Sequence, residues 1–227
     1  MGNASRRDFI AQLSGLTGVA VMQASGLLRF AAAQEQPSTD ALIARMKWMN
    51  EPASWKVSGS RIIVHTKPKT DFWRKTFYGY VTDNGHFFHL PVTGDFTFEA
   101  RIAGNYHDLY DQAGLMVRVD AENWMKCGTE LVDGMRHASV VFTREFSDWS
   151  TMNDLSNDGP VWWRAIRTKD SLELLCSLDG KKYASVRQGY LVPGRAAEVG
   201  VMCASPEGYG FEATFEGLKL SAAVPAS

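Results

Sequence analysis

The sequence predicts an all-β protein built as an antiparallel β-sandwich or jelly roll. In residues 95–103, apolar Phe96 and Phe98 alternate with polar Thr97 and Glu99, so one side of a strand is packed and the other is wet. Many further short segments alternate in the same way, and Gly, Pro, Asn and Asp lie between them. No segment of length repeats its apolar residues at the spacing of a helix.

About ten or more strands are expected along the chain, at a spacing typical of sandwiches. They lie at residues 61–66, 85–90, 95–103, 112–119, 124–131, 138–142, 161–168, 172–178, 199–204 and 211–220. The pair Asp179-Gly180 follows one of them, where a tight hairpin turn requires positive φ. A short helix is predicted over residues 41–48, behind a Ser or Thr cap.

The N-terminus predicts a twin-arginine signal peptide. Arg6 and Arg7 precede a mildly apolar stretch over residues 11–28, and small residues then end at Ala33. An anchoring helix is the alternative, but it needs about 20 predominantly apolar residues, and polar residues interrupt this stretch. Cleavage after Ala33 and a periplasmic or secreted location are therefore expected.

The expected organisation is a signal peptide at 1–33, a polar leader at 34–45, a single β-sandwich domain at 46–221 and a C-terminal tail at 222–227. Loss of residues 1–33 removes three arginines and one aspartate, which changes the formal charge from −1 to −3. A slightly acidic domain has no electrostatic attraction for nucleic acid or anionic membranes. Neither nucleic acid nor a stable membrane anchor is expected as a partner.

Three cysteines, Cys127, Cys176 and Cys203, lie in strand-like segments beside aliphatic residues. An odd number without conspicuous spacing argues against a disulfide framework. Buried free thiols are expected, while one disulfide formed after export stays open as an alternative.

Seven motifs, spread over nearly the whole expected domain, resemble a known family. They are WMNEP at 48–52, TDFW at 70–73, DNGH at 83–86, LYDQAGLMV at 109–117, NWMKCGTE at 123–130, SDWS at 147–150 and ASPEG at 204–208. Their order is similar to that of domain-of-unknown-function family 1349, also called regulation-of-enolase-like. The resemblance implies a concanavalin A-like lectin/glucanase sandwich and supplies no activity. Because enolase is cytosolic and export is expected here, the regulatory role is not carried over.

One strand face is the expected binding site. If Leu115 and Cys127 point inward, the opposite face carries Gln112, Met116, Arg118, Trp124, Lys126 and Glu130. Lys126 and Glu130 are ~13 Å apart along their strand, with Gly128 leaving a gap between them. They could bracket a ligand of one or two sugar rings, or each could pair with a neighbouring strand.

Tryptophans supply flat platforms for sugar rings, and Trp73 and Trp149 are preferred because their motifs look like loops. The expected ligand-binding residues are Trp73, Gln112, Arg118, Trp124, Lys126, Glu130, Asp148 and Trp149. The leading hypothesis is a carbohydrate-binding or carbohydrate-related module, with a saccharide ligand and, during export, the twin-arginine translocase as partners.

Two alternatives are kept. The first is a glycoside- or polysaccharide-active enzyme with Glu130 and Asp148 as acid and base, although no Glu-x-Asp-x-x-Glu strand is present. The second is a protein-interaction domain without a small-molecule ligand.

The five histidines show no paired ligand spacing, and Asp83, Asn84, Asp108 and Asp111 lack a regular calcium-loop register. No metal and no cofactor are expected.

Overall fold

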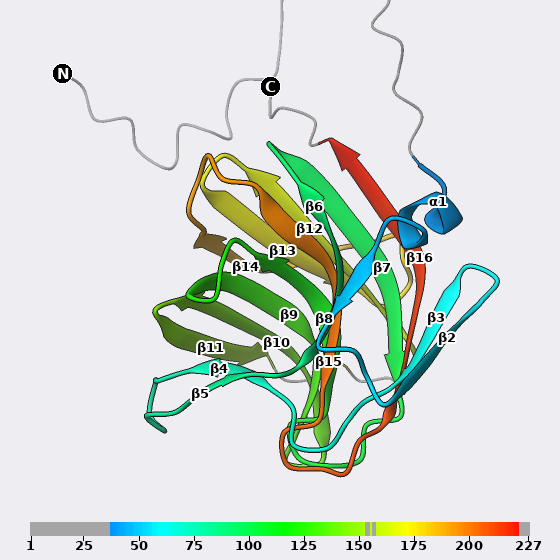
Figure 1. Cartoon of the computed structure of the whole chain (residues 1–227), viewed down its shortest axis with the longest axis vertical. Coiled ribbons are helices and arrows are strands. Elements are labelled where there is room, and N and C mark those ends of the chain that lie inside the picture. Colours follow the sequence, from blue (N-terminus) through cyan, green and yellow to red (C-terminus); the bar gives the residue numbers. More distant parts are fainter. Residues whose placement is uncertain (1–36, 153–154, 156–157, 223–227) are drawn as a thin grey trace, which may run out of the picture. The chain divides into compact units, whose positions relative to one another are not determined.

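The structure is a computed structural model that describes residues 37–152, 155 and 158–222. Two seven-stranded antiparallel sheets pack face to face, and a two-stranded hairpin lies beside one of them (Figure 1). The all-β sandwich expected from the alternation is confirmed. The expected signal peptide and its cleavage site at residues 1–33 lie outside the described residues. Within them, no helix has the length and apolar character to cross a membrane.

The first sheet has the strand order β1-β6-β15-β8-β9-β10-β11. Its strands are β1 (Lys47–Met49), β6 (His86–Val92), β15 (Ala197–Ala204), β8 (Gln112–Arg118), β9 (Asn123–Val132), β10 (Met135–Arg144) and β11 (Phe146–Met152). The second sheet has the order β14-β13-β12-β7-β16-β3-β2. Its strands are β14 (Ala184–Tyr190), β13 (Ser171–Ser177), β12 (Val161–Thr168), β7 (Phe96–Gly104), β16 (Glu212–Ala222), β3 (Arg61–His65) and β2 (Ser54–Ser58).

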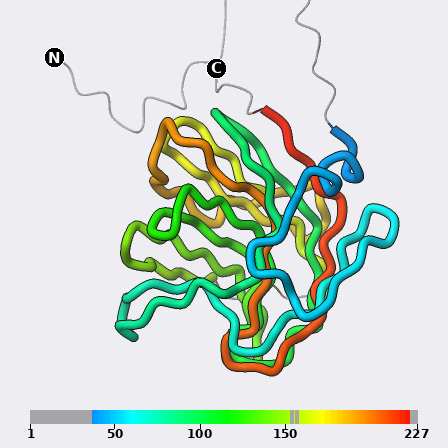
Figure 2. The backbone as a smooth tube through the Cα atoms, viewed as in Figure 1, coloured from blue at the N-terminus to red at the C-terminus, as the bar shows by residue number. Residues whose placement is uncertain are grey.

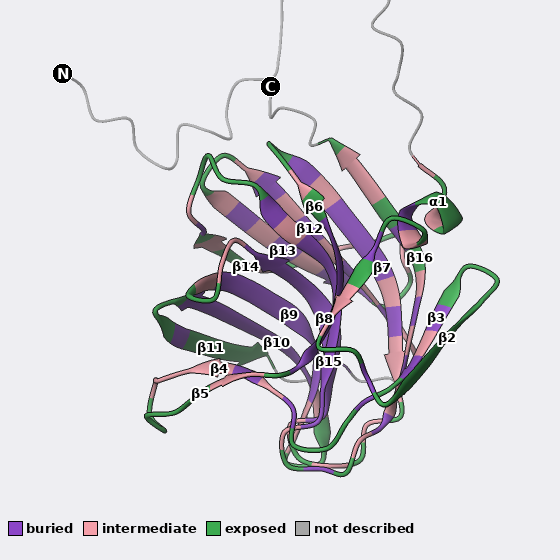
Figure 3. Ribbon diagram, viewed as in Figure 1, coloured by how far each residue is buried: buried purple, intermediate pink, exposed green. Residues whose placement is uncertain are grey.

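The main core lies between the two sheets and follows the predicted alternation. Phe96, Phe98 and Ile102 of β7 are at most 1% exposed, and they pack with inward residues of the first sheet such as Leu115 and Val140. Figure 3 shows buried residues concentrated on β8, β9 and β10, and exposed ones on β11. The period of two therefore identified the packed face correctly.

The first sheet also buries its outer face, which is unusual for an antiparallel sheet. A second apolar cluster lies there, made of Phe72, Phe87, Met116, Trp124, Val141, Met202 and Ala204. The hairpin of β4 (Phe72–Arg74) and β5 (Val81–Asp83) lies over this face, alongside β10 and β11 (Figure 2). Phe72 meets Trp124 edge to face, with ring centroids 6.2 Å apart.

The predicted helix is shorter and begins earlier than expected. Helix α1 spans Thr39–Ile43, and the Ser38 hydroxyl accepts a hydrogen bond from the Ala41 amide at 3.2 Å. The residues from Lys47 to Met49 form β1 instead, because Trp48 packs against Phe88 of the neighbouring β6 with ring centroids 4.8 Å apart. Tertiary packing here overrides a local helix signal.

Six strands lie outside the ten expected segments: β1, β2, the hairpin strands β4 and β5, and the edge strands β11 and β14. Of these, only β1 overlaps a segment that was assigned to another element, the predicted helix. Side chains of β2 and β11 are mostly exposed. A strand with two wet faces shows no alternation, so its hydrogen bonds to a neighbour are the feature that defines it. Trp149 consequently lies in a strand, where a loop was expected.

All three cysteines are free and buried, as expected. Burial raises the pKa of the Cys127, Cys176 and Cys203 thiols. Each thiol is therefore held protonated and acts as a small apolar side chain.

His86 joins three segments and is 1% exposed. Its Nε2 accepts a hydrogen bond from the Lys67 amide at 2.9 Å, so Nδ1 carries the proton and donates to the Asn50 carbonyl at 2.6 Å. Burial lowers the pKa of His86 below its ordinary value of 6.5, and the Asn50 contact opposes that shift only in part. The neutral ring is the form that fits the fold.

We expect the neutral ring of His86 to make the fold sensitive to mild acid. Below pH 6.5 the unfolded chain takes up a proton that the folded chain excludes, so stability falls until the pH passes the lower folded pKa. Urea unfolding at pH 7.5 and 5.5 should show a smaller loss in His86→Gln than in wild type. The exposed His65 gives the control, and His65→Gln should keep the wild-type loss.

Candidate functional site

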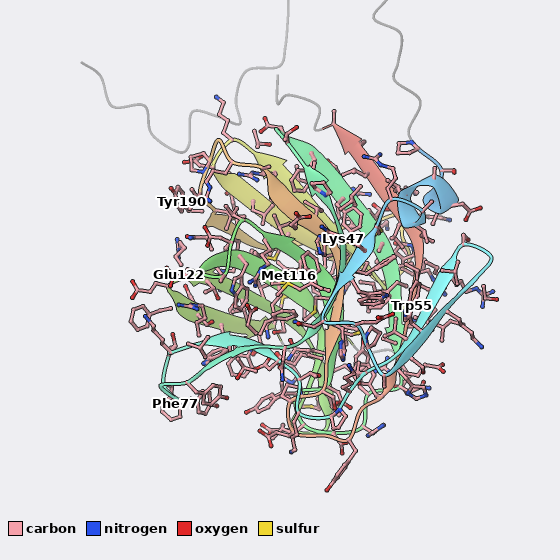
Figure 4. All side chains as sticks on the ribbon, in the orientation of Figure 1. Lys47, Trp55, Phe77, Met116, Glu122 and Tyr190 are labelled. Atoms are coloured by element: carbon pink, nitrogen blue, oxygen red, sulfur yellow. The ribbon has the colours of Figure 1, made fainter. Side chains whose placement is uncertain are left out.

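A pocket opens on the outer face of the first sheet, where the β4–β5 hairpin meets β8, β9, β10 and β11. It encloses about 90 Å³, several times the ~10–15 Å³ that one buried water needs. The lining residues are Asp71, Trp73, Tyr78, Tyr80, Tyr110, Gln112, Lys126, Glu130, Val141, Trp149, Pro206 and Glu207. Met116, which Figure 4 labels, belongs to β8 of the same sheet and is fully buried.

Strand register places the polar residues of the pocket in two rows across the sheet. In one row Gln112 of β8 is opposite Glu130 of β9. In the other, Lys126 is opposite Val141, which is opposite Trp149. Because residues separated by an even number share a face, these side chains all project outward into the pocket.

Glycines keep the floor between the two rows low. Gly114 and Gly128 are directly opposite each other on β8 and β9. A Cβ atom on Gly128 would lie 2.2 Å from the Ala113 carbonyl oxygen, and one on Gly114 would lie 1.8 Å from that of Cys127. Glycine is therefore required where β8 and β9 approach each other here, and Gly128 lines a small adjoining cavity together with Gln112, Lys126 and Glu130.

A buried ion pair connects the floor to the hairpin. The Lys126 ammonium lies 2.9 Å from Asp71 Oδ1, and the two side chains are 6% and 17% exposed. Asp71 is held in turn by its neighbours: its amide donates to Asn84 Oδ1 at 2.8 Å, and its carboxylate accepts from the Phe72 amide at 2.7 Å. The loop that precedes β4 thus fixes a carboxylate above the lysine.

Glu130 is buried to the same degree as Lys126 but forms no ion pair with any residue that the structure describes. It is 6% exposed and accepts from Gln112 Nε2 at 3.3 Å and from Trp149 Nε1 at 3.0 Å. Burial raises the pKa of Glu130, and the nearby Asp71 adds to the rise, while the charge of Lys126 opposes it without cancelling it. Burial in the pocket therefore makes the ionised form of this carboxyl less favourable than it is in water.

Five aromatic rings form the walls and the mouth. Trp73 and Tyr78 meet edge to face at 5.9 Å, Tyr78 stacks on Tyr80 at 5.4 Å, and Tyr110 meets Trp149 edge to face at 6.2 Å. Tyr78, Tyr80 and Trp149 remain 51%, 49% and 40% exposed. Phe77, at the tip of the hairpin, points away from the sheets (Figure 4). Rings that line a pocket while half open to water are available for contact with a ligand.

Five of the eight expected binding residues line this pocket: Trp73, Gln112, Lys126, Glu130 and Trp149. Trp124 does not, because it is 1% exposed and packs under the hairpin against Phe72. Arg118 anchors the hairpin, since its guanidinium donates to both carboxylate oxygens of Asp83 at 2.8 Å.

Asp148 lies on the opposite face of β11 from the pocket. It is opposite Phe142 in the register, and its carboxylate pairs at 2.8 Å with Arg187 of the second sheet. Two carboxyls on opposite faces of one sheet cannot flank a scissile bond, so the assignment of Glu130 and Asp148 as acid and base is wrong. Glu99 is also remote, on the second sheet, where it pairs with Arg164 and Lys219.

Sequence analysis missed the residues that the hairpin and the loops contribute. Asp71, Tyr78, Tyr80, Tyr110, Pro206 and Glu207 all belong to this group. The run Phe77-Tyr78-Gly79-Tyr80 is the signal that could have found the tyrosines, because apolar residues clustered at the surface often mark a binding site.

A cluster of His107, Asp108 and Asp111 has ligand atoms within 4.8 Å of one another. Its buried member already has partners: Asp111 accepts from the Ser205 hydroxyl at 2.6 Å and from the amides of His107 and Asp108. These contacts explain the cluster as loop structure. Asp83 and Asn84, also considered for calcium, are used by Arg118 and by the Asp71 loop.

A family model described as a protein of unknown function, DUF1349, matches residues 48–223. The chain belongs to this family. A Saccharomyces cerevisiae protein named Regulation of enolase protein 1 is 37% identical over 185 residues, which are 82% of this chain and 93% of the yeast protein. A solved structure of a functionally unknown protein from Saccharomyces cerevisiae matches with a TM-score of 0.78 and 37% identity, over 80% of this chain and 98% of that chain.

More distant structures show the fold alone. Xylan β-1,4-xylosidase from Bacillus halodurans C-125 matches with a TM-score of 0.64 and 12% identity, over 92% of this chain and 41% of that chain. An alginate lyase from Klebsiella pneumoniae matches with a TM-score of 0.57 and 8% identity, over 84% of this chain and 100% of that chain. The DUF1349 resemblance drawn from the motifs is confirmed, and so is the sandwich class.

These comparisons correct the expected location. The relative at 37% identity is a yeast protein, and yeast has neither a periplasm nor a twin-arginine system. The prediction of a periplasmic or secreted location reached by the twin-arginine route is therefore wrong. The expectation depended on short compositional features of residues 1–33, which carry no information about the fold that the family shares.

The expected carbohydrate function is corrected as well. The yeast relatives are named for enolase regulation or as functionally unknown, while the xylosidase and the lyase share only the fold. The inference from a lectin-like fold to a sugar ligand was an analogy, and one fold serves many functions. The open polar pocket also disfavours the alternative of an interaction domain without a ligand.

We expect Asp71→Asn to destabilise the protein by about 3 kcal/mol, because it leaves the Lys126 ammonium buried without its counter-charge. The matched control is Asp148→Asn, which breaks an ion pair of similar length whose carboxylate is 53% exposed. That variant should lose less than about 1 kcal/mol. Urea unfolding measures both, and equal losses would contradict the role given to the buried pair.

Gly128→Ala should cost about 3 kcal/mol, the upper part of the range for overpacking, because its new methyl group meets a backbone carbonyl that cannot move aside. Gly134→Ala is the comparison: its φ is +77° and no atom lies within 4 Å of the added Cβ, so only the left-handed backbone costs energy, about 1 kcal/mol. Thermal and urea unfolding should rank the two variants in this order, and the reverse order would exclude the close approach of β8 and β9.

Proposed function

We propose that the protein binds a small organic molecule in the aromatic pocket above Lys126 and Glu130. The observation that carries the proposal is a carboxyl and an ammonium, each at most 6% exposed, that lie at the base of an open pocket with five aromatic rings. Concave sites with apolar walls and a few convergent polar groups are the usual form of small-molecule sites.

The burial of these charges is costly, and the fold shows no structural need for both of them. Lys126 serves the hairpin through Asp71, but the hydrogen bonds of Glu130 come from the neutral donors of Gln112, Trp149 and Ser139. A well-packed apolar side chain would stabilise such a position better. A buried carboxyl with a perturbed pKa in a pocket is typical of functional sites.

The arrangement suits a ligand that has a polar end and an apolar part. The Gln112 amide and the Glu130 carboxyl offer hydrogen-bonding groups at the floor, which fix the orientation of a polar end. Trp73, Tyr80 and Trp149 offer flat apolar surface nearer the mouth, which suits the rest of the molecule. The yeast relative is named as a regulatory protein, and a ligand-binding site without an assembled catalytic pair is compatible with such a role.

Ligand-observed NMR with a library of small fragments tests this proposal. Saturation transfer to a subset of fragments is expected with wild type. The affinity of these fragments should fall at least about tenfold, or about 1.4 kcal/mol, in two variants. Val141→Phe adds bulk inside the pocket, and Gln112→Leu removes a polar group from the floor.

Tyr190→Ala is the matched control, because this ring is 44% exposed on β14 of the second sheet. It should keep wild-type binding, and thermal melting should show that each variant is folded. Fragments that bind all four proteins equally, or a library without any binder, would refute the pocket as a ligand site.

A further inference from the structure

The pocket carries more negative than positive groups. Its lining holds the carboxylates of Asp71 and Glu207 and the carboxyl of Glu130, against the single ammonium of Lys126. Asp71 already neutralises Lys126 at 2.9 Å. Glu207 is at the exposed rim, 3.5 Å from Lys69. Within the described part of the chain, Glu130 is the pocket carboxyl without an ion pair.

The aromatic walls also favour a positively charged ligand. Each ring presents a negative face, and a cation within about 6 Å of a ring centroid is attracted to it. Trp73, Tyr78 and Tyr80 approach the pocket from the hairpin, and Tyr110 and Trp149 approach it from the sheet. Rings on two sides of a space that holds a buried carboxyl resemble the cages that hold alkylated ammonium groups.

We propose that this pocket binds an organic ammonium cation with apolar N-substituents, such as a methylated amine, with Glu130 as its counter-charge and the aromatic rings around its substituents. The inference rests on the proposed function and names the ligand class for the same site.

Other ligand charges fit less well. A bound anion would face Glu130 and Asp71, and the one ammonium in the lining is already paired. A bare metal ion would require several oxygen ligands, whereas the walls are mainly rings. A neutral ligand would supply no counter-charge for the carboxylate of Glu130.

Binding of the cation should be coupled to the ionisation of Glu130. Burial raises the pKa of Glu130, and a bound ammonium would lower that pKa again, because its positive charge stabilises the carboxylate. Affinity should therefore fall as the pH decreases through the raised pKa of Glu130.

Four titratable groups face Glu130 and must be considered in the pH dependence. Lys126 shares its strand, Asp71 comes from the hairpin, Tyr110 comes from the loop before β8, and His137 is opposite on β10. The variant Glu130→Gln separates their contributions from that of Glu130 itself, because it keeps the shape of the side chain and removes only its titration.

Isothermal titration with two probes of the same shape tests the inference. Choline carries a trimethylammonium group, and 3,3-dimethylbutan-1-ol is its neutral isostere. Choline is expected to bind wild type at least about tenfold more tightly than the isostere, and its affinity should weaken from pH 8 to pH 5. In Glu130→Gln the preference should fall to within about twofold, and only the smaller pH dependence due to the neighbouring groups should remain.

A second variant keeps the test independent of any change in folding at the floor. Tyr80→Leu keeps apolar surface at the half-exposed mouth but removes the aromatic face. It should weaken choline at least about threefold and leave the isostere unchanged, while Tyr190→Ala on the second sheet should alter neither probe.

The outcomes separate this inference from the proposed function. If the isostere binds as tightly as choline, or if choline, tetramethylammonium and trimethyl-lysine all fail while library fragments bind, the cation inference is overturned and the ligand pocket remains. If neither the fragments nor the ammonium probes bind, both are overturned. Selective, Glu130-dependent binding of choline supports both.

Discussion

The site depends on the docking of the β4–β5 hairpin on the outer face of the first sheet. Phe72 inserts against Trp124, Asp83 pairs with Arg118 through two bonds of 2.8 Å, and Asp71 pairs with Lys126. Burial of a phenylalanine side chain contributes about 1.5–3 kcal/mol, which offsets part of the cost of bringing the charged groups out of water. Without the docked hairpin, the pocket would lack Trp73, Tyr78 and Tyr80 and would keep only the residues that the sheet and its loops supply.

The two charged contacts of the hairpin have different consequences. Arg118 and Asp83 form a bidentate pair whose geometry fixes the direction of β5. Lys126 and Asp71 place a neutral ion pair beside Glu130, so the lysine cannot fully serve Glu130 as a counter-charge. The same contact that closes the pocket therefore leaves one carboxyl in it electrostatically unsatisfied, as the raised pKa of Glu130 records.

Sequence reasoning succeeded where alternation decides the answer. It placed Gln112, Lys126 and Glu130 on one face of adjacent strands, because strand geometry alone fixes which side chains share a face. It failed where the pairing of neighbouring strands decides which way a side chain points. Asp148 and Trp149 are neighbours in one motif, yet only the register of β11 against β10 shows that Trp149 faces the pocket and Asp148 faces Arg187. The hairpin residues were missed because no local pattern states which sheet face a loop will cover.

The flat glycine floor and the aromatic walls limit what can occupy the pocket. Gly114 and Gly128 have no side chains that could reach a ligand, so the polar contacts that the sheet itself offers come from the two rows on either side of them. One row ends in Glu130 and the other in Lys126, which is already paired. A ligand that lies across the glycines therefore meets an available acceptor at one end and rings along its length. This asymmetry, rather than the sandwich fold that the chain shares with distant enzymes, is the feature that can distinguish one ligand from another.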